Sequence, residues 1–300
     1  MYSKMLIPLD GSKTSEKVLP YARHLAGKLK LPVELLAAID IAEMATHISA
    51  ERARHLDTMI EDGVRASTNY LRDVAATFAG AKVTCTVAKD RAEDTIIEKG
   101  DADANLLIAM ATHGRSGLNR FLLGSVTEKV LRGSANPLLL IRANEDSKAT
   151  GEAALKSIIV PLDGSELAES VLPAVASMAK ELALEVVLFR AYHIPYNTYG
   201  ADDAYMVNYE ELIAAVRDEA QEYIEKKVAE MKKLGVGMVT AVTKEGFAGD
   251  EIIAMGQRTP DNLIAMCSHG RSGVRRFVLG SVTETVVRHS GDPVLVLRAK

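Results

Sequence analysis

Tryptophan is absent from this 300-residue chain, and cysteine occurs only twice, as Cys85 and Cys267. Two cysteines this far apart do not make a disulfide framework, and neither lies in the paired spacing of a zinc knuckle. Such sparing use of cysteine is typical of proteins that work in a reducing compartment. The sequence therefore predicts a cytoplasmic protein without structural disulfides.

Long apolar stretches and an excess of positive charge are also lacking. No apolar run approaches the ~18 residues that a membrane-spanning helix needs, and the start, MYSKMLIPLDGS, lacks the pattern of a signal peptide. The formal net charge is -4, so no global basic field attracts nucleic acid. We therefore expect a protein that binds neither a membrane nor nucleic acid.

Several familiar nucleotide-binding and catalytic motifs are missing as well. The chain contains no G-x-x-x-x-G-K-[ST], no G-x-G-x-x-G after its first apolar run, and no G-x-S-x-G. The first absence excludes a P-loop NTPase at the level of sequence. The other two argue against a standard dinucleotide site and against a serine hydrolase of the nucleophile-elbow type.

What the chain has instead is a long internal repeat. HGRSGLNRFLLGSVTEKVLR at 113–132 returns as HGRSGVRRFVLGSVTETVVR at 269–288, with 15 of 20 positions identical. MLIPLDGS at 5–12 returns as IIVPLDGS at 158–165. The two shifts are 156 and 153 residues, which indicates a domain duplication rather than a solenoid. We expect one domain over residues 1–150 and a second over 151–300, with the boundary near Gly151.

Strand-like and helix-like segments alternate within each copy. In the first copy, the pattern predicts strands at 5–10, 33–40, 82–89, 105–111 and 137–142, and helices at 15–30, 43–78, 92–102 and 125–134. The run NLLIAMA is uniformly apolar, as in a parallel strand that is covered on both faces. This alternation predicts two tandem doubly wound α/β domains, each with a five-stranded, mostly parallel sheet. Ligands of such folds bind at the carboxyl ends of the strands.

Three features of each copy are expected at those carboxyl ends. In the first copy, an aspartate follows the first strand, a glycine lies in the loop after the fourth, and Gly-Ser opens the next helix. Glycine permits close approach of a ligand, and a helix N-terminus is a favourable place for phosphate. Arginines between the two glycines could neutralise phosphate charge. The residues are Asp10, Gly114, Arg115, Arg120, Gly124 and Ser125, repeated as Asp163, Gly270, Arg271, Arg276, Gly280 and Ser281.

Each of these features also has a purely structural interpretation. Ser125 and Glu128 fit a capping box, as do Ser281 and Glu284, and the aspartates fit Asp-Gly-Ser turns. The arginines fit a solvated surface. Two loop histidines, His113 and His269, have no acidic or cysteine partner at ligand spacing, and we interpret them as loop residues rather than metal ligands. The conjunction of these features at one edge, present twice, favours a ligand site.

The repeated motifs resemble the universal stress protein family in its tandem-domain form, over essentially the whole chain. The resemblance rests on IPLDGS and VPLDGS and on a segment similar to the family's G-x2-G-x9-G-[ST] signature. That segment reads Ala111-x2-Gly114-x9-Gly124-Ser125 in the first copy and Cys267-x2-Gly270-x9-Gly280-Ser281 in the second. The first signature glycine is thus replaced in both copies. Because a thiol is larger than a methyl group, we expect the second site to be the weaker one.

The resemblance implies flavodoxin-like, adenine-nucleotide alpha hydrolase-like domains that bind ATP, with or without Mg²⁺. By position, the aspartate would contact the ribose or adenosine end, a late residue of the second strand the adenine, and the glycine loop the phosphates. The implied residues of the first copy are Pro8, Asp10, Ala38, Met110, Ala111, Gly114, Arg115, Gly124, Ser125 and Val126. Those of the second are Asp163, Ala191, Met266, Cys267, Gly270, Arg271, Gly280, Ser281 and Val282.

Three functions are compatible with these residues. The resemblance favours a stress-response protein that senses or stores adenine nucleotide and has little or no turnover. A slow ATPase or nucleotidyl-transfer enzyme is the second hypothesis, although only Asp10 and Asp163 are candidate catalytic groups. A nucleotide-free dimerisation module is the third. The short apolar segments 137–142 and 293–298 are expected to pair the two domains within one chain, and a homodimer is compatible with the family.

Overall fold

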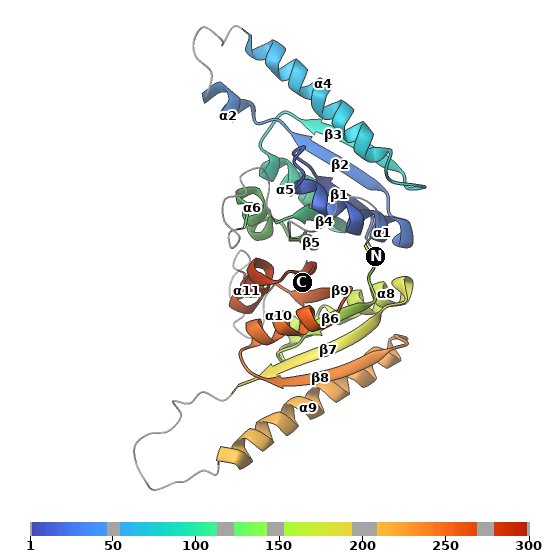
Figure 1. Cartoon of the computed structure of the whole chain (residues 1–300), viewed down its shortest axis with the longest axis vertical. Helices are drawn as coiled ribbons and strands as arrows, with labels where there is room; N and C mark the ends of the chain where they lie inside the picture. The colour runs from blue at the N-terminus through green and yellow to red at the C-terminus, as the bar shows by residue number, and fades with distance from the viewer. Residues whose placement is uncertain are drawn as a thin grey trace. The chain divides into compact units, whose positions relative to one another are not determined.

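Strands and helices alternate along the chain in a computed structural model, which describes residues 2–46, 55–112, 123–142, 153–193, 209–268 and 279–298 (Figure 1). The chain divides into two compact units. The first comprises residues up to 154 together with the last strand of the chain, and the second comprises most of the remainder from residue 155. The expected domain boundary near Gly151 lies outside the described residues.

Five parallel strands form the sheet of the first unit, in the order β3-β2-β1-β4-β5. They are β1 (Lys4–Pro8), β2 (Val33–Ala38), β3 (Val83–Ala88), β4 (Leu106–Ala111) and β5 (Leu138–Ile141). Strand β10 (Val294–Leu297) also belongs to this unit and runs antiparallel to β5. The strand order reverses between β1 and β4, so the carboxyl ends of these two strands flank the position where such sheets bind ligands.

The helices of the first unit depart in part from the predicted ones. They are η1 (Ser15–Val18), α1 (Leu19–Leu29), α2 (Ile41–Thr46), α4 (Leu56–Ala75), α5 (Ala92–Ala102) and α6 (Ser125–Gly133). The single helix predicted over 15–30 is a 3₁₀ turn followed by α1, with Pro20 in the first turn, where its missing N–H is harmless. Within the segment 43–78, the described residues form the end of α2 and the whole of α4, and residues 47–54 lie outside the described part of the chain.

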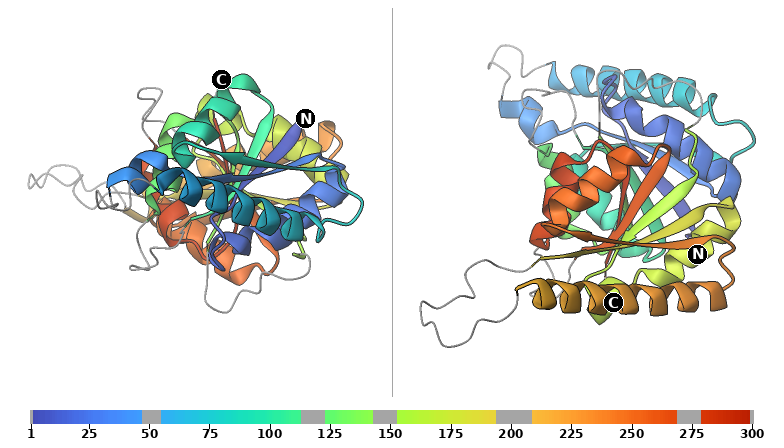
Figure 2. Two further views of the ribbon diagram at one scale, coloured as in Figure 1. Left: turned by 90° about the horizontal axis from the view of Figure 1, so that it is seen from above. Right: turned by 60° about the horizontal axis from the view of Figure 1, so that its bottom comes forward.

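The second unit repeats the arrangement of β1 to β4, while β10, the counterpart of β5 in the sequence repeat, belongs to the first unit. Its parallel strands β6 (Ser157–Pro161), β7 (Glu185–Tyr192), β8 (Val239–Glu245) and β9 (Asn262–Cys267) have the order β9-β6-β7-β8. Its helices are α7 (Glu166–Glu169), α8 (Leu172–Leu182), α9 (Tyr209–Lys233), α10 (Ala248–Arg258) and α11 (Ser281–His289). Helix α9 packs along β7 and β8 (Figure 2). The predicted fold class, tandem doubly wound α/β with a mostly parallel sheet, is confirmed.

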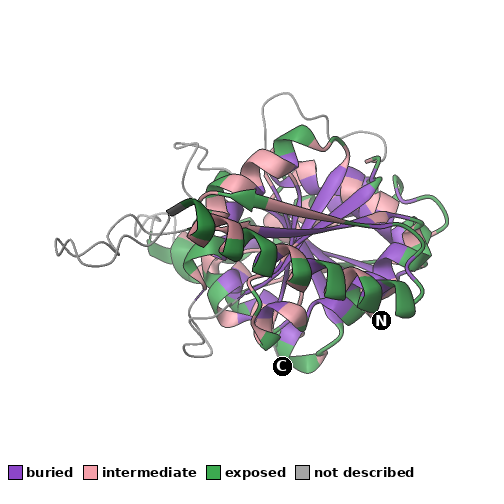
Figure 3. Ribbon diagram, turned by 90° about the horizontal axis from the view of Figure 1, so that it is seen from below, coloured by how far each residue is buried: buried purple, intermediate pink, exposed green. Residues whose placement is uncertain are grey.

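The cores lie in the central strands. Every residue of β4 and of β9 is buried, as predicted for strands that are covered on both faces. Figure 3 shows buried strands and helices that carry exposed faces. None of the described helices combines the length and the apolar character that crossing a membrane would require.

A buried glycine in α5 yields a test of how tightly this core is packed. A Cβ on Gly100 would overlap the side-chain oxygen of Asn136. Asn136 is 1% exposed, accepts a hydrogen bond from Ser134 Oγ (3.0 Å) and donates one to the carbonyl of Asp103 (2.7 Å), so it cannot yield. Gly100→Ala should therefore destabilise the chain by about 1–3 kcal/mol despite alanine's higher helix propensity.

Gly27 is the matched control for this measurement, which is chemical denaturation of each variant. It lies in α1, is exposed, and has open space where a Cβ would be. Gly27→Ala should leave stability unchanged or raise it by up to about 1 kcal/mol. Equal effects of the two substitutions would show that the contact with Asn136 is not tight.

Candidate functional site

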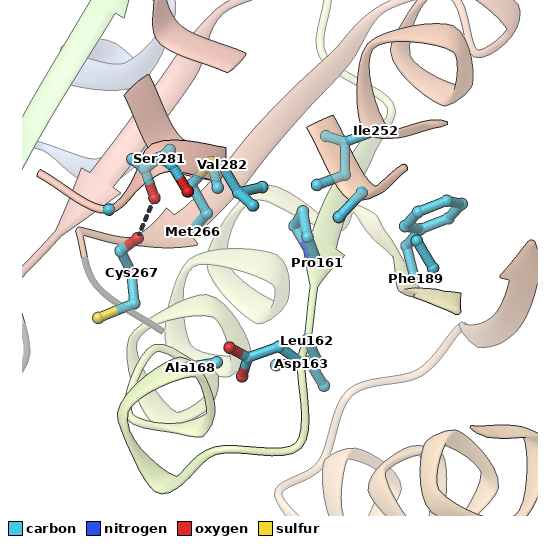
Figure 4. Close-up of a pocket in the computed structure, with 14 residues that line it drawn as sticks. Pro161, Leu162, Asp163, Ala168, Phe189, Ile252, Met266, Cys267, Ser281 and Val282 are labelled. Carbon is cyan, nitrogen blue, oxygen red and sulfur yellow. Dashed lines mark hydrogen bonds between the residues drawn. The ribbon is translucent and has the colours of Figure 1, made fainter. Parts of the chain in front are cut away.

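A pocket opens at the carboxyl end of the sheet in each unit, at the point where the strand order reverses. The cavity volume is about 250 Å³ in the first unit and about 270 Å³ in the second, whose lining residues Figure 4 shows. Both values lie just below the range for small-molecule sites, roughly 300–1,000 Å³. The two pockets therefore occupy the place where a doubly wound sheet binds its ligand.

Most of the residues implied by the resemblance line these two pockets. The first brings together Pro8, Asp10, Ala38, Met110, Ala111, Gly124, Ser125 and Val126. The second brings together Asp163, Ala191, Met266, Cys267, Gly280, Ser281 and Val282. The remaining candidates lie outside the described residues: Gly114, Arg115, Gly270 and Arg271, with the neighbouring His113, Arg120, His269 and Arg276.

Sequence reasoning missed a second group of lining residues. These are Leu9, Ser15, Leu36, Ala92 and Thr127 in the first pocket, and Pro161, Leu162, Ala168, Phe189, Ala248, Ile252 and Thr283 in the second. Some carry a signal that could have found them. Leu36 lies two residues before Ala38 in a strand, and alternate strand residues face the same side. Others come from helix starts that only the fold brings to the pocket.

The helix after the fourth strand begins at the pocket without a side-chain cap. Gly124 is the N-cap of α6, with φ -60° and ψ 145°, and Gly280 is the N-cap of α11, with φ -63° and ψ 143°. The predicted capping boxes are therefore wrong, because Ser125 and Ser281 are the first helical residues and not the caps. Glycine has no side chain with which to satisfy the first N–H groups. Each pocket thus contains the positive end of a helix dipole that no described side chain caps.

Hydrogen bonds hold each helix start against the end of the preceding strand. The N–H of Gly124 donates to the carbonyl of Thr112 (2.7 Å), and Thr127 Oγ1 donates to the carbonyl of Ala111 (3.1 Å). In the second unit, the N–H of Gly280 donates to Ser268 (2.8 Å), and Thr283 Oγ1 donates to Cys267 (2.8 Å). The strand end and the helix start are thereby fixed relative to each other in both units.

The aspartate after the first strand combines a turn role with a place in the pocket. Asp10 Oδ1 accepts hydrogen bonds from the N–H (2.9 Å) and the hydroxyl (2.6 Å) of Ser12. Asp163 Oδ1 accepts the same pair from Ser165, at 2.9 and 2.6 Å. The turn interpretation is thus confirmed, and both aspartates line the pockets as well. A carboxylate held in this way is a preorganised hydrogen-bond acceptor just after the carboxyl end of β1 and of β6.

A tyrosine–glutamate pair lies beside each aspartate. The hydroxyl of Tyr70 donates to Glu16 Oε1 (3.0 Å), and burial together with the negative charges of Glu16 and Asp10 raises the pKa of Tyr70. The hydroxyl of Tyr223 donates to Glu169 Oε1 (2.8 Å), and burial and Glu169 raise its pKa in the same way. The repetition of both residues at a shift of 153 is the signal that could have indicated this pair in the sequence.

The position that departs from the family signature is extended backbone in both units. Ala111 ends β4 and Cys267 ends β9, and neither has a positive φ, so neither substitution strains the chain. The thiol of Cys267 lies 3.9 Å from the hydroxyl of Ser170, and Figure 4 shows the sulfur turned away from Val282. The expected weakness of the second site rests on this thiol alone and stays a prediction.

Fold and pocket together define the class of the molecule. It is a duplicated, doubly wound α/β protein of flavodoxin-like architecture. One pocket of each copy combines a carboxylate, a bare helix N-terminus and an apolar slot, which is lined by Leu36, Ala38 and Ala92 in the first copy and by Phe189, Ala191 and Ala248 in the second. Within the described residues, no three His, Cys, Asp or Glu side chains are grouped so as to hold a metal ion.

The chain belongs to the universal stress protein family. The model of the "Universal stress protein family" matches residues 1–142 and again residues 154–298. Universal stress protein MJ0531 of Methanocaldococcus jannaschii is 30% identical over 150 residues, covering 49% of this chain and 85% of that protein. Universal stress protein Rv2005c of Mycobacterium tuberculosis is 24% identical over 301 residues, covering 98% of this chain and 96% of that protein.

A solved structure has the same fold over the whole length. The crystal structure of a universal stress protein from Archaeoglobus fulgidus is 21% identical, covers 99% of this chain and 96% of that one, and has a TM-score of 0.65. The tandem form of the family, predicted from the sequence repeat, is therefore confirmed.

Proposed function

We propose that each unit binds ATP or a related adenine nucleotide in its pocket, and that the protein serves as a cytoplasmic nucleotide sensor or store in a stress response. One observation carries this proposal. The bare N-termini of α6 and α11 face the same pockets as an apolar slot and a carboxylate. A helix N-terminus of this kind favours phosphate, whereas the apolar slot favours a flat base.

The residues that are present fit the parts of such a ligand. The N–H groups at Ser125 and Val126 would hold phosphate oxygens, and Asp10 would accept hydrogen bonds from ribose hydroxyls. The base would lie against Ala38 and Ala92, where the wall is small and apolar. The second pocket offers the corresponding positions. Mg²⁺, where it takes part, would accompany the phosphates.

The proposal predicts that ATP stabilises the folded chain. A ligand present at a hundred times its Kd adds about 2.7 kcal/mol to the free energy of unfolding, which raises Tm by roughly 5–10 °C for domains of this size. Thermal unfolding with and without ATP measures the shift, and acid release of nucleotide from the purified protein is an independent check. Phosphate release should stay at background if the protein is a binding module, and steady release would favour the ATPase alternative. Absence of any thermal shift at millimolar ATP would contradict nucleotide binding.

We also infer that segments 137–142 and 293–298 join the two halves of one chain, an arrangement with which a further homodimer is compatible. Apolar terminal strands would be hazardous if they were left open, which supports the first of these inferences. Small-angle scattering of the dilute protein measures the separation of the two domains. Two well-separated domains would contradict the pairing.

A further inference from the structure

The two pockets differ at the rim of the apolar slot, where strand β2 or β7 ends. Alternate residues of an extended segment face the same side. Asp40 follows the pocket residue Ala38 by two positions, and His193 follows the pocket residue Ala191 by two. The two positions correspond in the repeat, at a shift of 153. The first rim therefore has a carboxylate where the second has an imidazole.

The opposite side of the rim is formed by the residue before α5 or α10. Ala92 and Ala248, the first residues of these helices, line the two pockets. Their extended N-cap residues are Arg91 in the first unit and Phe247 in the second. These positions also correspond, at a shift of 156. The first rim therefore has a guanidinium where the second has a phenyl ring.

The two sides of each rim contact each other. In the first unit, Arg91 Nε lies 3.7 Å from Asp40 Oδ2, which makes an ion pair. In the second unit, the ring centroids of His193 and Phe247 are 4.4 Å apart and the rings are tilted by 39°. The same place in the fold thus carries a charged pair in one copy and an aromatic pair in the other.

Phe247 is held at the surface by its backbone. Phe247 is 65% exposed, and it is the only aromatic residue among the exposed large apolar residues of the described chain. Gly246, just before it, has φ 147°, and its N–H donates to the carbonyl of Tyr192 (2.9 Å) at the end of β7. A φ of 147° lies in a region that residues with a Cβ rarely adopt, so this turn requires glycine. An exposed ring fixed beside an apolar slot gains most if a flat apolar partner covers it.

We propose that His193 and Phe247 stack on the base of a nucleotide in the second pocket, so that this pocket selects purine over pyrimidine nucleotides. The first pocket, which carries an ion pair at the same position, selects less between bases. This inference rests on the proposed function and deepens it, because it assigns a base preference to one of the two sites. Stacking on an aromatic side chain is worth roughly tenfold in affinity per base, and the larger purine gains more than a pyrimidine.

The experiment isolates one pocket at a time. Gly124→Asp disables the first and Gly280→Asp the second, and calorimetric titration with ATP and CTP then gives the purine preference of the pocket that remains. In the Gly124→Asp protein, Phe247→Ala should lower ATP affinity about tenfold and CTP affinity less, so that the ATP/CTP ratio falls. In the Gly280→Asp protein, the matched Arg91→Ala should change that ratio less than about threefold. Because Phe247 is largely exposed, its replacement should leave the Tm of the free protein unchanged.

A fluorescent variant provides a second readout that does not depend on an affinity change. The natural chain has no tryptophan, so Phe247→Trp introduces a single reporter. ATP should quench its emission, whereas inorganic tripolyphosphate, which has no base, should not. An unchanged ATP/CTP ratio after Phe247→Ala, or equal responses of the tryptophan to ATP and to tripolyphosphate, would overturn the stacking role while nucleotide binding stood. Failure of both single-pocket proteins to bind any nucleotide would instead overturn the proposed function itself.

Discussion

Gly124→Asp should lower the ATP affinity of the first pocket by at least about a hundredfold and leave the fold intact. Gly124 has φ -60° and ψ 145°, a conformation that aspartate adopts at helix N-caps. The new carboxylate would accept hydrogen bonds from the first turn of α6 and so occupy the donors that phosphate needs. Its charge would add repulsion of several kcal/mol at an effective dielectric of about 20. The same side chain should therefore stabilise the helix and exclude the ligand.

Two further variants separate the causes of this loss. Gly124→Asn introduces a neutral cap of the same shape, and Gly124→Ala adds a methyl group that neither caps nor carries charge. We expect the affinity to fall most for aspartate, less for asparagine and least for alanine. Calorimetry in a Gly280→Asp background records the first pocket alone. An aspartate variant that still bound ATP with full affinity would show that the start of α6 does not hold phosphate.

The alternation of elements could be predicted from local sequence, and the edge that carries the site follows from that alternation. The predicted helix over 92–102 coincides with α5, since its composition and flanking residues suffice to define it. The positions of Asp10 and Gly124 at one pocket follow from strand order, because parallel strands bring their carboxyl ends to the same edge. Each of these patterns occurs in both copies of the repeat, which argues against a chance match.

The start of α6 could not be predicted correctly, because local pattern and geometry disagree there. Ser125 and Glu128 have the spacing of a capping box, yet the helix begins one residue earlier than that motif requires, with Gly124 as its cap. The contact between the rim residues could not be predicted from the sequence for another reason. His193 and Phe247 are 54 positions apart, and only the folded sheet brings their rings together. No local pattern indicates such a contact.

A buried glutamate in β2 was likewise hidden within an apolar segment, and it is expected to govern acid stability. Glu34 is 5% exposed and corresponds in the repeat to Val187, so the second unit has no counterpart. Its carboxylate is 2.5 Å from Lys4 Nζ and 2.7 Å from Lys99 Nζ, and it accepts a hydrogen bond from Thr86 (2.9 Å). Burial alone would raise the pKa of Glu34, but the hydrogen bonds from Lys4, Lys99 and Thr86 outweigh it and lower the pKa to about 2.

Glu34→Gln should therefore destabilise the first unit by about 2–4 kcal/mol at neutral pH, because two lysines lose their buried partner. The wild-type carboxylate has a lower pKa when folded than when unfolded, so its contribution is complete above the ordinary glutamate value of 4.5 and is lost as the pH falls towards 2. The difference between the two proteins should shrink over that same interval. Amide exchange in β1 and β2, followed between pH 7 and pH 2.5, reports the stability of this unit alone.

Asp62→Asn is the control, because the ion pair of Asp62 with Arg65 lies on an exposed face of α4 in the same unit. Surface pairs of this kind contribute little, so this variant should unfold like the wild type at every pH. Glu34→Gln should instead show a stability that depends less on pH than that of the parent, since it lacks the carboxylate that titrates. If Glu34→Gln were less stable than the wild type by the same free energy at pH 7 and at pH 2.5, Glu34 would stabilise the sheet through packing and not through its charge.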